Sequence, residues 1–177
     1  AASDVYKRQE GYSPSPQERQ SWLQISYMKE AYHTMGPKFT LGWMAEALYS
    51  SKNFSENYTA TMMQAGEFAP TPHSKLMYNE AFRANQYVAA GIKPIYVLND
   101  MFQFRTEFYG FTPIFPIKKN ALNKAYYGKA FSRFEYMGEV SVICHLPFGA
   151  ISAYVNHYSS PRREWNVCLL YTSPSPR

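Results

Sequence analysis

The sequence predicts an all-β fold, an antiparallel up-and-down transmembrane β-barrel fragment of about seven strands that does not close. Apolar and polar residues alternate with a period of two over most of the chain, which is the pattern of strands with one apolar and one polar face. The connections between these segments alternate between short and long, as in barrels with tight turns at one end. Aromatic residues make up 18% of the chain, which also favours β-structure.

The two ends of the chain are interpreted as translated sequencing adaptor. Written as the codons GTG TAT AAG AGA CAG, residues 5–9 have the reverse complement CTG TCT CTT ATA CAC, which in a shifted frame encodes the Cys-Leu-Leu-Tyr-Thr of residues 168–172. Protein chemistry gives two termini no reason to be related in this way. We therefore expect residues 1–9 and 168–177 to be adaptor, and residues 10–167 to be a partial outer-membrane β-barrel domain.

Excluding these ends changes the charge and the cysteine content. The net charge falls from +5 to +3 without Lys7, Arg8, Arg177 and Asp4. No clustered stripe of Lys and Arg remains, so no nucleic-acid partner is expected. Cys168 belongs to the adaptor, and Cys144 is then the single cysteine, which excludes a disulfide framework and a cysteine metal cluster.

The first predicted hairpin has the clearest alternation. A strand over residues 23–31 is followed by a turn at 35–37 and a strand over 39–50. The apolar row is Leu23, Ile25, Tyr27 and Ala31, then Phe39, Leu41, Trp43, Ala45, Ala47 and Tyr49, with Lys29 as the exception. Polar residues such as Gln24, Ser26, Glu30, Thr40 and Glu46 occupy the opposite row.

Five more strands follow. The third is expected to start near Ala81, with Phe82, Ala84, Val88, Ala90 and Ile92 on one face and Gln86 out of pattern. The fourth follows a turn at residues 99–100 and covers 102–108, and the fifth covers 134–146. A turn at 147–149 leads to the sixth strand at 151–156, and a seventh begins at Trp165 and is cut by the adaptor. Long connections are expected at 51–80 and 113–132, and a shorter one at 159–164.

Alternation alone does not say whether the apolar row points inward, as in a soluble ligand-binding barrel, or outward to lipid. Three features favour the membrane arrangement. The polar row holds charges of both signs: Glu30, Glu46, Arg83, Lys93, Arg105, Glu107, Glu135 and Glu139. Trp and Tyr stand near strand ends on the apolar row, at Trp22, Tyr49, Tyr96 and Tyr136. Several outward positions are Ala or Gly, which would pack a soluble core poorly.

A transmembrane helix over residues 140–161 is the competing interpretation of the longest run without charge. Pro147, Gly149 and several polar residues interrupt this run, and its alternation is two-fold. A hairpin is therefore favoured.

Catalytic and metal-binding motifs are not found. There is no Gly-x-Ser-x-Gly, the single Asp of residues 10–167 is Asp100 in a predicted turn, and His33, His73, His145 and His157 lack metal-ligand spacing. Ser141 and His145 share a strand face but lie ~13 Å apart, too far for a nucleophile and its base. No catalytic, cofactor or metal site is expected. The charged row is expected to pair with itself rather than to line a pore, and Cys144 is interpreted as a small apolar residue.

Several segments resemble the C-terminal, surface-antigen-like barrel of outer-membrane patatin-like phospholipases from Gram-negative bacteria. They are ENYTAT (56–61), FAPTPH (68–73), AFRANQYVAAGIKPI (81–95), EFYGF (107–111), YMGE (136–139), LPFG (146–149) and NHYSSP (156–161). None of these segments is a catalytic motif, so the resemblance identifies a module and not an activity.

The resemblance implies a membrane anchor for a lipid acyl hydrolase whose Ser–Asp dyad lies upstream of Glu10. It also implies a location in the bacterial outer membrane, with membrane lipids and the barrel-assembly machinery as partners, and it leaves homo-oligomerisation open. The alternatives are a transport or structural barrel without an enzyme domain, and a soluble ligand-binding barrel.

Overall fold

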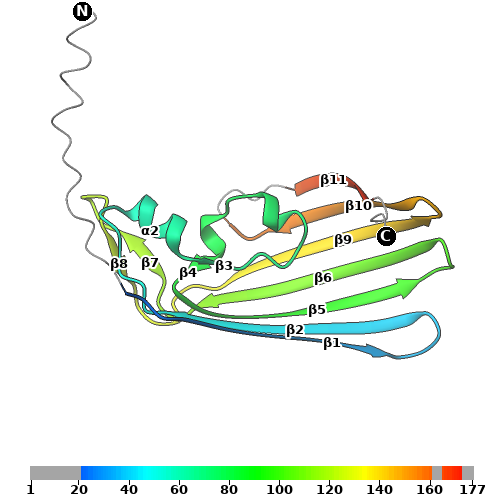
Figure 1. The fold of residues 1–177 in the computed structure, drawn as a ribbon, viewed down its shortest axis with the longest axis horizontal. Coiled ribbons are helices and arrows are strands. Elements are labelled where there is room, and N and C mark those ends of the chain that lie inside the picture. Colours follow the sequence, from blue (N-terminus) through cyan, green and yellow to red (C-terminus); the bar gives the residue numbers. More distant parts are fainter. Residues whose placement is uncertain (1–20, 161–164, 173–177) are drawn as a thin grey trace, which may run out of the picture.

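Seven long β-strands lie side by side in one antiparallel sheet (Figure 1). The computed structural model describes residues 21–160 and 165–172. The strands are β1 (Gln24–Thr34), β2 (Phe39–Ser50), β5 (Gln86–Val97), β6 (Phe102–Pro113), β9 (Glu135–Leu146), β10 (Gly149–Tyr158) and β11 (Trp165–Thr172). They neighbour one another in chain order, β1-β2-β5-β6-β9-β10-β11. Among the described residues β1 and β11 do not pair, so the sheet is open at both edges.

The short turns join the strands where the sequence predicts them. Gly36 and Gly149 have φ of +141° and +150°, which L side chains rarely adopt. The Asn99 side chain accepts hydrogen bonds from the backbone N–H groups of Met101 (3.0 Å) and Phe102 (2.7 Å) and so closes the β5–β6 turn. The prediction of seven consecutive antiparallel strands is confirmed.

The helical interpretation of residues 140–161 is wrong where these residues are described, because they form the β9–β10 hairpin. Pro147 and the positive φ of Gly149 turn the chain back on itself there. No helix within residues 21–160 and 165–172 is long and apolar enough to cross a membrane.

The third strand differs from the prediction. It starts at Gln86, because Phe82 ends the 3₁₀ helix η2 (Glu80–Phe82) and Ala84 lies in β4 (Arg83–Ala84). The short strand β4 pairs with β3 (Gly66–Glu67) in a separate two-stranded sheet. Phe82 and Ala84 are consequently buried, whereas Val88 is exposed, and the predicted common face is wrong. Apart from Gln86 the alternation runs on through residues 82–92, but its first residues lie in η2 and β4 and not in the large sheet.

The last strand extends through residues 168–172, which the sequence analysis assigns to adaptor, and pairs with β10 along its length. An open sheet edge offers unpaired N–H and C=O groups to any extended segment that follows it. The pairing therefore does not depend on the origin of the segment. The remaining adaptor assignments, residues 1–9 and 173–177, lie outside the described residues.

Both long connections contain structure of their own at one end of the sheet (Figure 1). Residues 51–85 hold the helix α2 (Tyr58–Gln64), β3, the 3₁₀ helix η1 (Ser74–Leu76), η2 and β4. Residues 114–134 hold a hairpin of β7 (Ile117–Lys119) and β8 (Ala125–Tyr127). The Asn57 side chain caps α2 by accepting a hydrogen bond from Ala60 N–H at 2.8 Å. The sequence pattern predicts long connections here but none of these short elements.

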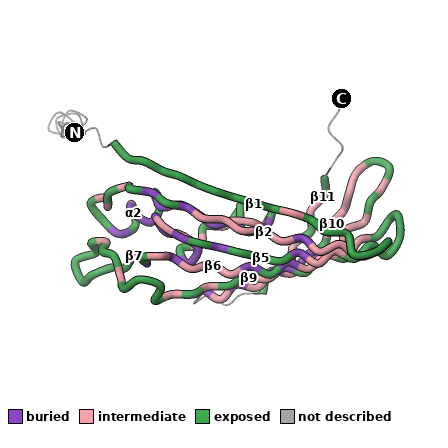
Figure 2. The backbone as a smooth tube through the Cα atoms, turned by 90° about the horizontal axis from the view of Figure 1, so that it is seen from below, coloured by how far each residue is buried: buried purple, intermediate pink, exposed green. Residues whose placement is uncertain are grey.

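The two faces of the sheet differ in burial. One face, called here the inner face, is covered by residues 51–85, and the hydrophobic core lies between them. The opposite, outer face carries the predicted apolar row and stays exposed, with Ile92 at 48% and Phe108 at 53%. On the inner face, Glu107 is 1% and Lys93 6% exposed. In Figure 2 the buried residues follow the strands and the long connections, while β1 is exposed almost throughout.

Candidate functional site

Charged side chains from four strands form a band across the inner face. This charge band consists of Glu30 on β1, Lys93 on β5, Arg105 and Glu107 on β6, and Glu139 on β9. Lys93 Nζ donates to the Glu30 carboxylate, and Arg105 Nη2 donates to the Glu107 carboxylate. The register of β6 and β9 places Glu139 opposite Glu107. The prediction that these charges pair with one another is confirmed for the two ion pairs.

Tyrosine hydroxyls give the carboxylates further donors. Tyr32 Oη donates to Glu30 at 2.6 Å, and Tyr109 Oη donates to Glu107. Each tyrosine follows its glutamate by two residues, so a strand places both on the same face. The alternation of polar residues identifies the glutamates but not these tyrosines, although the spacing of two residues from each glutamate is a signal for them.

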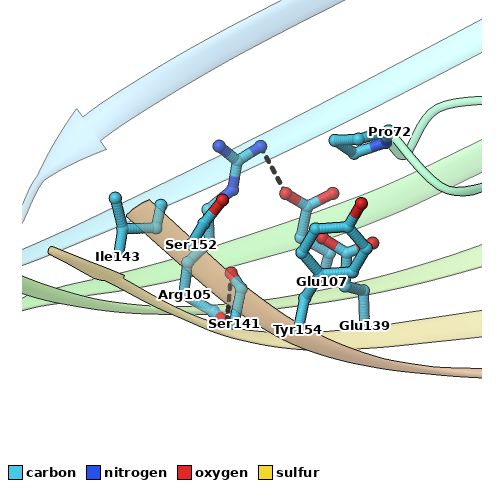
Figure 3. Close-up of a pocket in the computed structure, with 8 residues that line it drawn as sticks. All are labelled: Pro72, Arg105, Glu107, Glu139, Ser141, Ile143, Ser152 and Tyr154. Atoms are coloured by element: carbon cyan, nitrogen blue, oxygen red, sulfur yellow. Dashed lines mark hydrogen bonds and ion pairs between the residues drawn. The ribbon is translucent and has the colours of Figure 1, made fainter. Parts of the chain in front are cut away.

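A small hollow of about 60 Å³ lies beside the charge band. Its lining residues are Pro72, Arg105, Glu107, Glu139, Ser141, Ile143, Ser152 and Tyr154 (Figure 3). Among the described residues, Glu139 takes part in no ion pair. Two of the lining residues carry a buried polar atom without a protein partner, Arg105 Nε and Glu139 Oε2, and Asn156 Nδ2, on β10 opposite Glu139, is a third such atom. Buried polar atoms of this kind are normally satisfied by ordered water, so the hollow is suited to hold water or a small polar molecule.

Ser141 and His145 make separate contacts. Ser141 Oγ donates to the backbone oxygen of Arg105 at 3.3 Å, whereas the ring of His145 contacts Gln103 Oε1 at 3.4 Å. The two residues lie four positions apart on β9 and contact different groups, as their spacing predicts.

The other histidines are distributed over distant parts of the fold. His33 accepts a hydrogen bond from Trp43 Nε1 at 3.4 Å, and the ring of His157 packs against Trp165. His73, in the first long connection, contacts Tyr158 Oη through Nδ1 at 2.8 Å, and burial lowers the pKa of His73. In residues 21–160 and 165–172, no three His, Cys, Asp or Glu side chains gather as a metal site would need.

Comparison with models of protein families, with curated proteins and with solved structures returns no match. The resemblance to patatin-like barrels thus stays a prediction from the sequence segments. The sheet combines a covered, charged inner face with an exposed, apolar outer face.

Proposed function

We propose that residues 10–167 form part of an outer-membrane β-barrel whose outer face contacts lipid and whose inner face lines the interior. The observation that supports this proposal is the inverted burial of the sheet, with Glu107 and Lys93 buried while Ile92 and Phe108 are exposed. Exposure of a whole apolar face to water costs free energy, whereas contact of that face with lipid hydrocarbon does not.

The competing soluble barrel would have the opposite arrangement. A soluble ligand-binding barrel buries its apolar row inside, and soluble monomers rarely expose apolar patches larger than a few hundred Å². The strands β1, β2, β5, β6 and β9 are 11 or 12 residues long, enough for a tilted crossing. Exposed aromatic residues at strand ends, Trp22, Tyr49, Tyr96 and Tyr136, fit the two membrane interfaces.

Quenching by brominated lipid tests which face contacts hydrocarbon. In a chain carrying Trp22→Phe and Trp165→Phe, refolded from urea into vesicles, Trp43 on the outer face of β2 is the remaining tryptophan. We expect brominated acyl chains to quench Trp43 strongly. The matched variant adds Trp43→Phe and Tyr32→Trp, which moves the indole to the inner face of β1, opposite Gly42. Its fluorescence should resist the lipid and respond to aqueous acrylamide.

Quenching of only the inner indole by brominated lipid contradicts the membrane proposal. Quenching of neither indole contradicts it as well. A chain that stays monomeric in buffer without lipid and unfolds cooperatively there would also contradict it, and the soluble barrel would take its place.

We further propose that the parent protein is a patatin-like lipid acyl hydrolase and that this barrel anchors it. The support is the resemblance of segments such as 81–95 and 156–161, together with the barrel-like pattern of the sheet. In that family a serine attacks the lipid ester carbonyl without a histidine, and an aspartate completes the dyad. Those residues would lie upstream of Glu10, so no residue of this chain is assigned to catalysis.

Extending the DNA beyond both ends of the chain in its source sample tests this second proposal. We expect an upstream reading frame with Gly-x-Ser-x-Gly and a later Asp-Gly. An upstream region with only a signal peptide and further alternating strands would contradict the enzyme and leave a transport or structural barrel.

A further inference from the structure

The first long connection folds back onto the inner face of the sheet. Residues 51–85, called here the plug segment, supply the most buried part of the chain outside the long strands. Phe68 and Phe82 are buried in the same cluster as Tyr87, Tyr109 and Phe111 of the sheet. A loop that merely connected two strands would place such side chains in solvent.

Aromatic contacts fix the plug segment to three strands. The ring of Phe68 stacks on Phe111 at 5.8 Å and meets the edges of Tyr87 (6.1 Å) and Tyr109 (6.0 Å). The ring of Phe82 contacts Phe111 at 5.7 Å and Tyr158 at 6.0 Å. All these partners point to the inner face, from β5, β6 and β10, and Met137 of β9 completes the same cluster.

Polar contacts hold the segment on both sides of the aromatic cluster. Tyr87 Oη donates to Glu46 at 2.6 Å and lies 3.2 Å from the backbone oxygen of Glu67 in the plug segment. On the other side, His73 contacts Tyr158 Oη. Between them, Pro72 reaches the rim of the hollow above Glu107 and Glu139 (Figure 3).

Internal bonds order the plug segment in addition to its contacts with the sheet. Thr71 N–H donates to Ser74 Oγ at 2.9 Å, and Ser74 N–H donates to Thr71 Oγ1 at 3.2 Å. Arg83 ties β4 to the end of α2 through the backbone oxygens of Met63 and Ala65 and forms an ion pair with Glu67. A segment ordered by its own bonds loses less conformational entropy on docking than a flexible loop does.

We propose that residues 51–85 are a lumenal plug that seals the inner face, at the end of the long connections, against water-soluble molecules. The inference rests on the proposed barrel, because that barrel makes the inner face a lumen. The plug covers the aromatic part of the inner wall and stops at the charge band. The inner face near the short turns, at Ile95 and Gln103, remains only half-buried.

Thiol labelling tests the plug directly. All variants carry Cys144→Ser and Cys168→Ser, and receive either Ala89→Cys or Ile95→Cys. Both positions lie on the inner face of β5, but Ala89 belongs to the cluster under the plug and Ile95 does not. With a water-soluble maleimide we expect the Ala89→Cys thiol to react at least about tenfold more slowly than the Ile95→Cys thiol. The reason is that the plug segment must open locally before the Ala89→Cys thiol can react. Phe68→Ala with Phe82→Ala should accelerate only the Ala89→Cys reaction.

Equal rates at the two thiols in the chain with both phenylalanines present would overturn the plug. If the phenylalanine variant loses its β-sheet signal in circular dichroism, a second variant is used in which a Gly-Ser linker replaces residues 54–82. In this variant the inner face of the sheet is not covered by the plug segment. The Ala89→Cys thiol must then react faster, and an unchanged rate overturns the proposal. The rates are compared in whichever medium the sheet forms. A sheet that forms only without lipid or detergent contradicts the barrel. The comparison of the two thiol rates still tests whether residues 51–85 cover the inner face.

Discussion

Replacing Arg105 by Met should lower the free energy of unfolding of the chain in detergent micelles by about 3–5 kcal/mol. The guanidinium is the ion-pair partner of Glu107, whose side chain is almost fully buried and faces Glu139 across the β6–β9 pair. Without Arg105, two carboxylates would share a buried site with no cation bonded to either. Urea titration followed by far-ultraviolet circular dichroism measures the change.

The second substitution Glu107→Gln should restore most of the stability lost in Arg105→Met, because it removes the charge that was left unpaired. Arg133→Met is the matched control, since Arg133 is about as exposed as Arg105 and pairs with Glu135 at 2.8 Å. Glu135 is less buried than Glu107 and also accepts a hydrogen bond from Ser159 Oγ. Arg133→Met should therefore lower the free energy of unfolding by about 1 kcal/mol or less. Equal losses for Arg105→Met and Arg133→Met would show that the charge band is solvated.

Replacing Phe68 by Ala should cost about 3–5 kcal/mol, the range for removing a buried aromatic side chain from a packed core. Phe68 is 1% exposed and contacts Tyr87, Tyr109 and Phe111. The cavity would open between the plug segment and the inner wall, so both should lose packing together. The same urea titration measures the loss.

Leu76→Ala provides the control within the same segment, because Leu76 is 83% exposed. Its effect should stay within about 0.5 kcal/mol. A loss at Phe68→Ala as small as that at Leu76→Ala would mean that the plug segment contributes little to the stability of the folded sheet.

The period-two pattern predicted most of the large sheet, because a strand's faces are defined by local geometry alone. The six strands other than β5 begin within a few residues of their predicted positions, and the turns at Gly36, Asn99 and Gly149 follow from residue types that favour them. The charged row was predicted for the same reason, since Glu30, Lys93, Arg105, Glu107 and Glu139 each fall on the polar parity of their strand.

The start of β5 shows where local pattern fails. Residues 82–92 alternate with Gln86 as the single exception, yet Phe82 and Ala84 belong to the plug segment. Their place is decided by contacts with Phe111, Tyr158 and β3, which lie far away in the sequence. Short elements such as α2, which Asn57 caps, and η1 are missed because they are too short to carry a long periodic pattern.

The sequence by itself determined which residues lie on each face of the seven long strands, apart from the start of β5, and that these strands pair in chain order. Only the tertiary structure decided which face is covered, because both assignments satisfy the same alternation. Residues 51–85 cover the inner face, because Phe68 and Phe82 pack among its tyrosines and Phe111. This segment therefore covers the face that carries the charged row and leaves the apolar row exposed.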